Sequence, residues 1–126
     1  MKSNITEIEV NGVQYIKKGT ESQQVASKDG LTLCMLRTYS AGVFYGWVNY
    51  ESENTFHGVE VLDAIRVYGW EGAFTLSQLA TLGTSKPGEC TFAITVPKLK
   101  LNRVVELIPV TNMSLKTLSE VEQKKC

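Results

Sequence analysis

The chain has 126 residues, which is enough for one domain with a substantial core but too few for two. Its 13 basic and 13 acidic side chains cancel, so it lacks the cationic surplus with which duplex nucleic-acid binders displace counterions. We therefore expect one domain over residues 1–126. If the protein binds a charged ligand, we expect a small ligand, because two or three phosphates need only a local cluster of cations.

The first thirty residues are predicted to form a hairpin followed by a loop. Alternating residues flank Asn11-Gly12, a strong hairpin signal because both positions accept positive φ, so residues 4–18 are predicted as a β-hairpin. The polar stretch from Gly19 to Gly30 is interpreted as a loop or loose linker. Residues 31–126 form the predicted core of the domain.

Three further β segments are predicted between the linker and the first helix. Residues 31–39 and 43–50 form a strand pair around Ser40-Ala41-Gly42, and a polar turn follows over residues 51–54. A third, longer segment covers residues 56–67 and ends at the turn-like Tyr68-Gly69.

One short helix is predicted to interrupt the strands. Thr75 caps it, the apolar spacing runs to Leu82, and Gly83 ends it. Two strands follow over residues 91–96 and 99–108, separated by Pro97 and expected to pair with each other.

A second helix is predicted at the end of the chain. Thr111 or Asn112 caps it, one narrow apolar stripe runs from Leu115 to Val121, and the cations of residues 123–125 suit its C-terminal end. The predicted fold class is therefore α+β: a mostly antiparallel β-sheet with one short inserted helix and a C-terminal helix.

Catalytic and metal chemistry find little support in the sequence. Cys34, Cys90 and Cys126 are odd in number and form no C-x-x-C pair, which favours a reducing compartment. His57 is the single histidine, and no nucleophile lies beside it in the sequence. The N-terminal residues lack the apolar stretch of a signal peptide, and no run reaches membrane length. We expect a cytosolic protein that is not an enzyme and uses no metal or cofactor.

Two segments that join an arginine to a turn are the main candidates for a binding site. Arg37 precedes Ser40 and Ala41, and a turn of small residues exposes N–H groups that, with a guanidinium, could hold a phosphate. Alternatively, Arg37 pairs with a surface carboxylate. Arg66 precedes Tyr68 and Trp70, whose rings could face an adenine or the guanidinium itself, or could instead form an aromatic corner that closes the sheet.

A third candidate group lies on the last two strands. Phe92 could stack on a base while Asn102, next to Arg103, reads the edge of that base, since an amide matches the donor and acceptor of adenine. The expected strand pairing would bring Phe92 near Val104 and Val105. The alternative, which composition favours, is a core phenylalanine and a turn asparagine.

Four segments resemble a family of small phage and prophage β proteins. They read R-T-Y-S-A-G-V-x-x-G, A-x-R-V-Y-G-W-E-G-A, T-L-S-Q-L-A-x-x-G-T-S-K-P-x-x-C, and P-V-T before the last helix. The resemblance covers Cys34 to about Val121, so the first thirty-odd residues look like an addition. We identify the characterised relatives as the Thoeris anti-defence type 1 sponges, which sequester cyclic ADP-ribose isomers made by bacterial TIR-domain enzymes.

The resemblance implies binding without turnover in the host cytoplasm. Such sponges are homo-oligomers, dimers or assemblies of dimers, with pockets at the subunit interface, and some also hold cyclic oligonucleotides at a separate site. Carried over by position, Arg37 would face phosphate and Arg66 phosphate or ribose. Phe92 would stack on the adenine, and Asn102 would hydrogen-bond the adenine or a ribose.

The sequence departs from the resemblance at one place. Where relatives often have two adjacent arginines and two tryptophans, this chain has Ile65-Arg66 and Tyr68 with Trp70, which removes one cation from the cluster that would hold a second phosphate. Two other classes of function stay open. One is a small β module that stacks on single-stranded nucleic acid, and the other is a phage structural protein without a ligand, in which the aromatics form the core.

Overall fold

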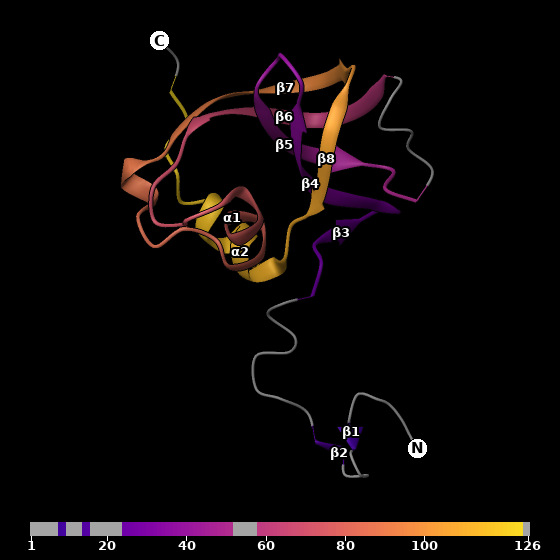
Figure 1. Cartoon of the computed structure of the whole chain (residues 1–126), viewed down its shortest axis with the longest axis vertical. Coiled ribbons are helices and arrows are strands. Elements are labelled where there is room, and N and C mark those ends of the chain that lie inside the picture. The colour runs from indigo at the N-terminus through magenta and orange to yellow at the C-terminus, as the bar shows by residue number, and fades with distance from the viewer. Residues whose placement is uncertain (1–7, 10–13, 16–23, 52–57, 125–126) are drawn as a thin grey trace.

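The computed structural model describes residues 8–9, 14–15, 24–51 and 58–124 (Figure 1). Its body is a curved antiparallel sheet with two short helices that pack on each other against one side. The strand order is β3 (Ser27–Lys28), β4 (Leu31–Thr38), β5 (Val43–Val48), β6 (Val59–Gly69) and β7 (Thr91–Leu101). The last strand, β8 (Val104–Pro109), pairs with the same edge of β4 as β3. The predicted α+β fold, with a short inserted helix and a C-terminal helix, is confirmed.

The two edges of this sheet meet at one end. β7 at one edge and β8 at the other are joined by only Asn102 and Arg103, and a connection of two residues spans about 10 Å at most. Arg103 adopts a φ of 57° in this tight turn. The sheet therefore has to curl, and in Figure 1 β6 and β7 run across the direction of β8.

The predicted pairing of residues 91–96 with residues 99–108 is wrong. β7 continues without a break through Pro97 and pairs along its length with β6, whereas β8 pairs with β4. Proline is tolerated here because β7 is an edge strand, so no partner strand needs the missing N–H. Phe92 consequently lies opposite Val67 and not beside Val104 or Val105.

Curling gives the sheet a buried core on each face. Along β4, Leu33 and Met35 join one core while Cys34 and Leu36 join the other, as the alternation of a strand requires. We call the core beneath the helices the helix core; its main members are Leu33, Met35, Tyr45, Val67, Leu76, Leu79, Ala80, Phe92, Val110 and Leu118. We call the other the strand core; it consists of Cys34, Leu36, Phe44, Val48, Val59, Val61, Ala64, Leu101 and Val104.

The inserted helix forms where the sequence predicts it. α1 spans Leu76–Leu82, Thr75 Oγ1 accepts a hydrogen bond of 3.0 Å from the Gln78 amide, and Gly83 ends the helix with a φ of 86°. A short 3-10 helix, η2 (Pro87–Glu89), then leads into β7.

The terminal helix is shorter than predicted. α2 spans Asn112–Leu118 and is capped by Thr111, whose Oγ1 accepts from the Ser114 amide. Lys124 therefore lies beyond the end of the helix, and the prediction that places it at the helix C-terminus is wrong; Lys125 lies outside the described residues. The Lys124 amide instead donates to the Phe92 carbonyl, because the free edge of β7 offers acceptors that compete with a further helical turn.

The predicted linker between Gly19 and Gly30 is also wrong over its described part. β3 pairs with β4 through the two-residue turn Asp29-Gly30, whose φ angles of 53° and 80° fit a type I′ hairpin. Earlier in the chain, β1 (Ile8–Glu9) and β2 (Gln14–Tyr15) pair antiparallel, as the N-terminal hairpin prediction requires. The rest of residues 4–18, the stretch 19–23 and His57 lie outside the described residues.

The connection from β6 to β7 is tightly packed around Gly72. Its φ is +87°, and an added Cβ would lie 2.5 Å from Thr84 Oγ1 and 2.7 Å from the Lys86 amide nitrogen. We expect Gly72→Ala to lower the free energy of unfolding by about 3 kcal/mol, from left-handed strain and overpacking together. Gly88→Ala, where nothing lies within 4 Å, should change it by less than about 0.5 kcal/mol. Urea denaturation measures both; equal effects would contradict this packing.

We expect alkaline pH to destabilise the protein, because a buried thiol and a buried tyrosine hydroxyl lose their protons there. Burial raises the pKa of the Cys34 thiol and of the Tyr45 hydroxyl to about 12 each, from ordinary values of 9.0 and 10.0. Because their pKa values are higher in the folded state than in the unfolded state, these two groups leave the free energy of unfolding unchanged below about pH 9. They lower it progressively as the pH rises from about 9 toward 12. Melting temperatures from pH 8 to 12 should fall less steeply in Tyr45→Phe than in the wild type. Tyr68→Phe, at an exposed tyrosine, should keep the wild-type slope.

Candidate functional site

Several of the predicted site residues lie at or beside the turn between β4 and β5. Thr38 holds this turn in shape, since its Oγ1 accepts from the Ala41 amide and donates to the Gly42 carbonyl, both at 2.8 Å. Ser40 and Ala41 remain exposed at the tip. The Ala41 amide is already used by Thr38, so an anion at this turn would be held chiefly by side-chain cations.

Arg66 reaches the turn from β6. Its Nη1 donates a hydrogen bond of 2.6 Å to the Ala41 carbonyl, and its Cζ lies 4.4 Å from the centre of the Phe44 ring. The contact follows from the register, which places Arg66 directly opposite Phe44 on the strand-core face of the sheet. The ring and the carbonyl together hold the guanidinium in one position.

Arg103 reaches the same turn from the connection between β7 and β8. Its Cζ lies 4.4 Å from the centre of the Tyr39 ring, and its carbonyl accepts from the Tyr39 amide at 2.9 Å. Tyr39 and Ala41 are two residues apart, so their Cα atoms lie within about 7 Å of each other. Two guanidiniums from distant parts of the chain therefore each contact a residue at the turn, Arg66 at Ala41 and Arg103 at Tyr39.

We call this region the arginine surface; it consists of Tyr39, Ser40, Ala41, Phe44, Arg66 and Arg103. Among the described residues, the ion pairs are Arg37–Glu106 and Lys98–Glu60, so neither arginine of the surface has a carboxylate partner there. Two positive charges held beside ring faces, without a neutralising carboxylate, favour an anion with a planar group.

Tyr68 lies at the edge of this surface. It sits two residues beyond Arg66, where the pairing of β6 with β7 shifts register between Val67 and Gly69. Its side chain is 70% exposed and that of Tyr39 is 68% exposed, so both rings have area free for contact with a ligand or a partner. Trp70, in contrast, packs against the helix core, and its Nε1 donates to the Ala73 carbonyl at 3.2 Å. Trp70 therefore fits the alternative in which it forms part of an aromatic corner that closes the sheet.

Arg37 lies on the opposite face of the sheet from Arg66. Its neighbours along β4 show this, because Leu36 belongs to the strand core with Phe44 whereas Met35 belongs to the helix core. Its Nε donates to Glu106 Oε1 at 2.8 Å, as the alternative interpretation of Arg37 expected. The structure therefore does not bring Arg37 and Arg66 onto one binding surface within one copy of the chain.

Phe92 and Asn102 are engaged elsewhere. Phe92 is fully buried in the helix core, with its ring edge-on to Tyr45 at a centroid separation of 5.5 Å, so it offers no face to a base. Asn102 Oδ1 accepts from the Gly58 amide at 2.9 Å and thereby fixes the start of β6. Phe92 is therefore a core residue and Asn102 a turn residue, as the alternative interpretation expected.

Sequence reasoning missed two residues of the arginine surface. Tyr39 stands inside the R-T-Y-S-A-G segment, but its arginine partner is Arg103, which lies 64 positions further along the chain. Phe44 is predicted as a strand residue, and its role depends on the register between β5 and β6. The position of an aromatic ring beside a turn is a sequence feature that could have identified Tyr39 as a site residue. No feature of the sequence identifies Phe44 in this way.

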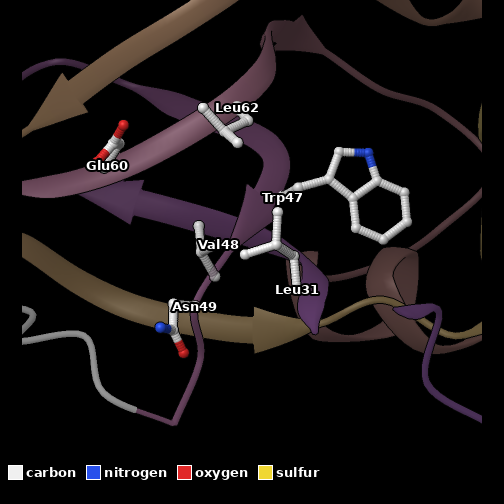
Figure 2. A pocket seen from close by; sticks show the side chains of 6 residues that line it. All are labelled: Leu31, Trp47, Val48, Asn49, Glu60 and Leu62. Carbon is white, nitrogen blue, oxygen red and sulfur yellow. The ribbon is translucent and has the colours of Figure 1, made fainter. Parts of the chain in front are cut away.

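A pocket lies on the helix-core side of the sheet, away from the arginine surface (Figure 2). Trp47 flanks it, opposite Leu33 on β4 and Leu62 on β6, and Lys28 Nζ lies 5.0 Å from the centre of the Trp47 ring. The pocket has a volume of about 260 Å³ and is lined by Leu31, Trp47, Val48, Asn49, Glu60 and Leu62. Glu60, paired with Lys98 at 3.3 Å, places negative charge in it. A phosphate therefore suits this pocket less well than it suits the arginine surface.

Residues 8–9, 14–15, 24–51 and 58–124 contain neither a metal-binding cluster nor a membrane-spanning helix. No group of three or more histidine, cysteine or acidic side chains lies close enough there to hold a metal ion. No helix in that part of the chain has the length and apolar character needed to cross a membrane.

Comparison with known proteins returned one match. A family model described as a domain of unknown function (DUF6948) matches residues 31–118, from the start of β4 to the end of α2. Neither the curated proteins nor the solved structures gave a match.

The Arg66 guanidinium should contribute modestly to stability. Arg66→Ala removes one hydrogen bond to the turn and one contact with the Phe44 ring, so we expect the free energy of unfolding to fall by about 1 to 2 kcal/mol. Urea denaturation, with Arg66→Lys as the variant that keeps the charge, measures this. A loss above about 4 kcal/mol would show that the guanidinium is mainly a structural group.

Proposed function

We propose, starting from the fact that the chain belongs to the DUF6948 family, that it binds a small phosphate-bearing signal and sequesters it without cleavage. The proposed ligand is a cyclic ADP-ribose isomer or a related cyclic nucleotide, and the proposed setting is phage anti-defence in the host cytoplasm. The observation that carries the proposal is that Arg66 and Arg103, each over an aromatic ring, contact residues of the same turn between β4 and β5.

The charge of the arginine surface supports a ligand with two adjacent phosphates. A guanidinium presents a planar fork of donors that matches phosphate oxygens, and two of them approach one turn here. The chain as a whole has no net charge, so attraction to a long polyanion is weak while local attraction to a pyrophosphate remains. The resemblance of the R-T-Y-S-A-G segment to the Thoeris sponges supports the class of signal.

The composition of the arginine surface supports the proposal of binding without turnover. Among the described residues it contains no histidine and no carboxylate, so these residues supply neither a general base for a nucleophile nor an acid for a leaving group. Guanidinium groups and ring faces can hold a ligand through hydrogen bonds and stacking without forming a covalent bond to it. The role proposed is therefore that of a sponge.

A second copy of the chain would complete the site. The arginine surface lies open on one side of the molecule, and sequestration requires a ligand enclosed on more than one side. Tyr39 and Tyr68 present exposed rings beside it, which suit contact with a base or with another protein surface. We therefore propose a homo-oligomer, built from dimers, whose pockets lie between copies.

Binding is tested with purified full-length protein, isothermal titration calorimetry and cyclic ADP-ribose isomers as ligands. Arg66→Gln and Arg103→Gln should each weaken binding by about 30- to 100-fold, because each removes a charged hydrogen bond worth about 2 to 3 kcal/mol. Arg37→Gln is the matched control, since Arg37 pairs with Glu106 on the other face, and it should bind within about threefold of the wild type.

Three results would overturn the proposal, and each points to a different function. Recovery of a hydrolysed product after heat release would indicate an enzyme. Binding of single-stranded nucleic acid that weakens steeply with salt would indicate a stacking module. A melting temperature that no nucleotide raises, even at saturating concentration, would indicate a structural protein without a ligand.

A further inference from the structure

The edge strand β7 begins with a segment that is well suited to pairing with a further strand. Residues 91–96 read T-F-A-I-T-V, of which four are β-branched and none is charged or a proline. One side of β7 pairs with β6, whereas no named strand of the described residues pairs with the other side. Ile94 and Val96 are 51% and 39% exposed. The first half of β7 therefore offers an apolar edge.

The second half of the same edge is protected by its own side chains. Pro97 has no N–H to donate, and the side chains of Lys98 and Lys100 are exposed. Charges and prolines of this kind oppose the addition of a strand, because they repel like charges and interrupt the hydrogen-bond ladder. Residues 91–96 contain neither, so their protection has to come from elsewhere in the chain.

Residues 121–124, which we call the strap, lie along this unprotected half. Val121 is 7% exposed and belongs to the helix core, so it anchors the strap to the body of the molecule. Gln123 forms a parallel bridge with Phe92, and the Lys124 amide donates to the Phe92 carbonyl at 2.8 Å. The strap therefore occupies a backbone acceptor that a further strand would use.

The side chain of Gln123 extends this cover along β7. Its Nε2 donates to the Ala93 carbonyl at 2.9 Å and to Thr95 Oγ1 at 3.0 Å. Both hydrogen bonds lie at exposed positions, so the strap can open locally while the cores stay intact. The strap thus closes the edge over residues 92–95 through contacts that are few and accessible to water.

We infer that the strap holds closed an edge of β7 that otherwise pairs with the β7 edge of a second copy of this chain. A second copy suits the edge because it brings the same uncharged segment, which continues the sheet across a twofold axis. An antiparallel pair centred between residues 93 and 94 brings Lys98 of each copy toward Glu89 of the other, so opposite charges approach and the lysines stay apart.

The strap and the second copy compete for one edge. While the strap is closed, only the open fraction of molecules can pair, and the apparent dissociation constant rises in inverse proportion to that fraction. The inference concerns β7 and the strap, so it depends neither on the arginine surface nor on the proposed ligand. An oligomer that forms through the arginine surface is present in the wild type and in the strap variants alike.

Analytical ultracentrifugation of the full chain over a range of concentrations tests the inference. Gln123→Ala combined with Lys124→Pro removes three hydrogen bonds of the strap, because alanine has no amide side chain and proline has no N–H. This released variant should self-associate at least about tenfold more tightly than the wild type, since its open fraction is larger. Lys124→Ala is the matched control. It removes the same charge but keeps the backbone amide, and it should sediment as the wild type does.

A charge placed on the edge identifies the surface that associates. Adding Ile94→Lys to the released variant should return self-association to the wild-type level, because two like charges then lie at the centre of the pair. Circular dichroism at low concentration shows whether each variant is folded before it associates. If Lys124→Pro prevents folding, Gln123→Ala alone removes two of the hydrogen bonds and carries the same test.

Four outcomes would overturn the inference. They are a released variant that associates no more tightly than the wild type, a Lys124→Ala variant that associates as tightly as the released one, association that survives Ile94→Lys, and association that accompanies only loss of the native circular dichroism spectrum.

Discussion

The two-residue connection between β7 and β8 is the constraint on which the rest of the structure depends. It joins strands from opposite edges of one sheet, so the edges meet and the sheet curls. Curling divides the apolar residues between two cores, one beneath the helices and one within the bend of the strands. It also carries Arg103 across to the turn that follows β4.

The arginine surface is a consequence of that closure. Arg66 belongs to the third long strand of the sheet and Arg103 to the connection that closes it, yet both approach the turn of Ser40 and Ala41. Neither guanidinium is neutralised by a carboxylate among the described residues. Ring contacts and a backbone carbonyl hold the two side chains, which leaves their charge available to an anion.

Local signals predicted the elements that depend on local physics. Thr75 and Gly83 bound α1 as the sequence indicates, because a cap and a left-handed glycine act within one helical turn. Asp29-Gly30 carries a hairpin signal of the same kind as Asn11-Gly12, although it lies within a polar stretch that is also typical of a linker. Pro97 was misread as a strand end, because whether a proline is tolerated depends on which strand lies at the edge of the sheet.

The sequence by itself determined the fold class, the bounds of α1 and the segments that hold the arginines and aromatics. The tertiary structure alone decided which of those residues meet. Phe92 lies in the core because β7 pairs with β6, and Arg37 lies on the far face from Arg66 because neighbouring residues of a strand alternate. Strand order, register and closure join residues far apart in the chain, and hydrophobic spacing within one segment carries no information about them.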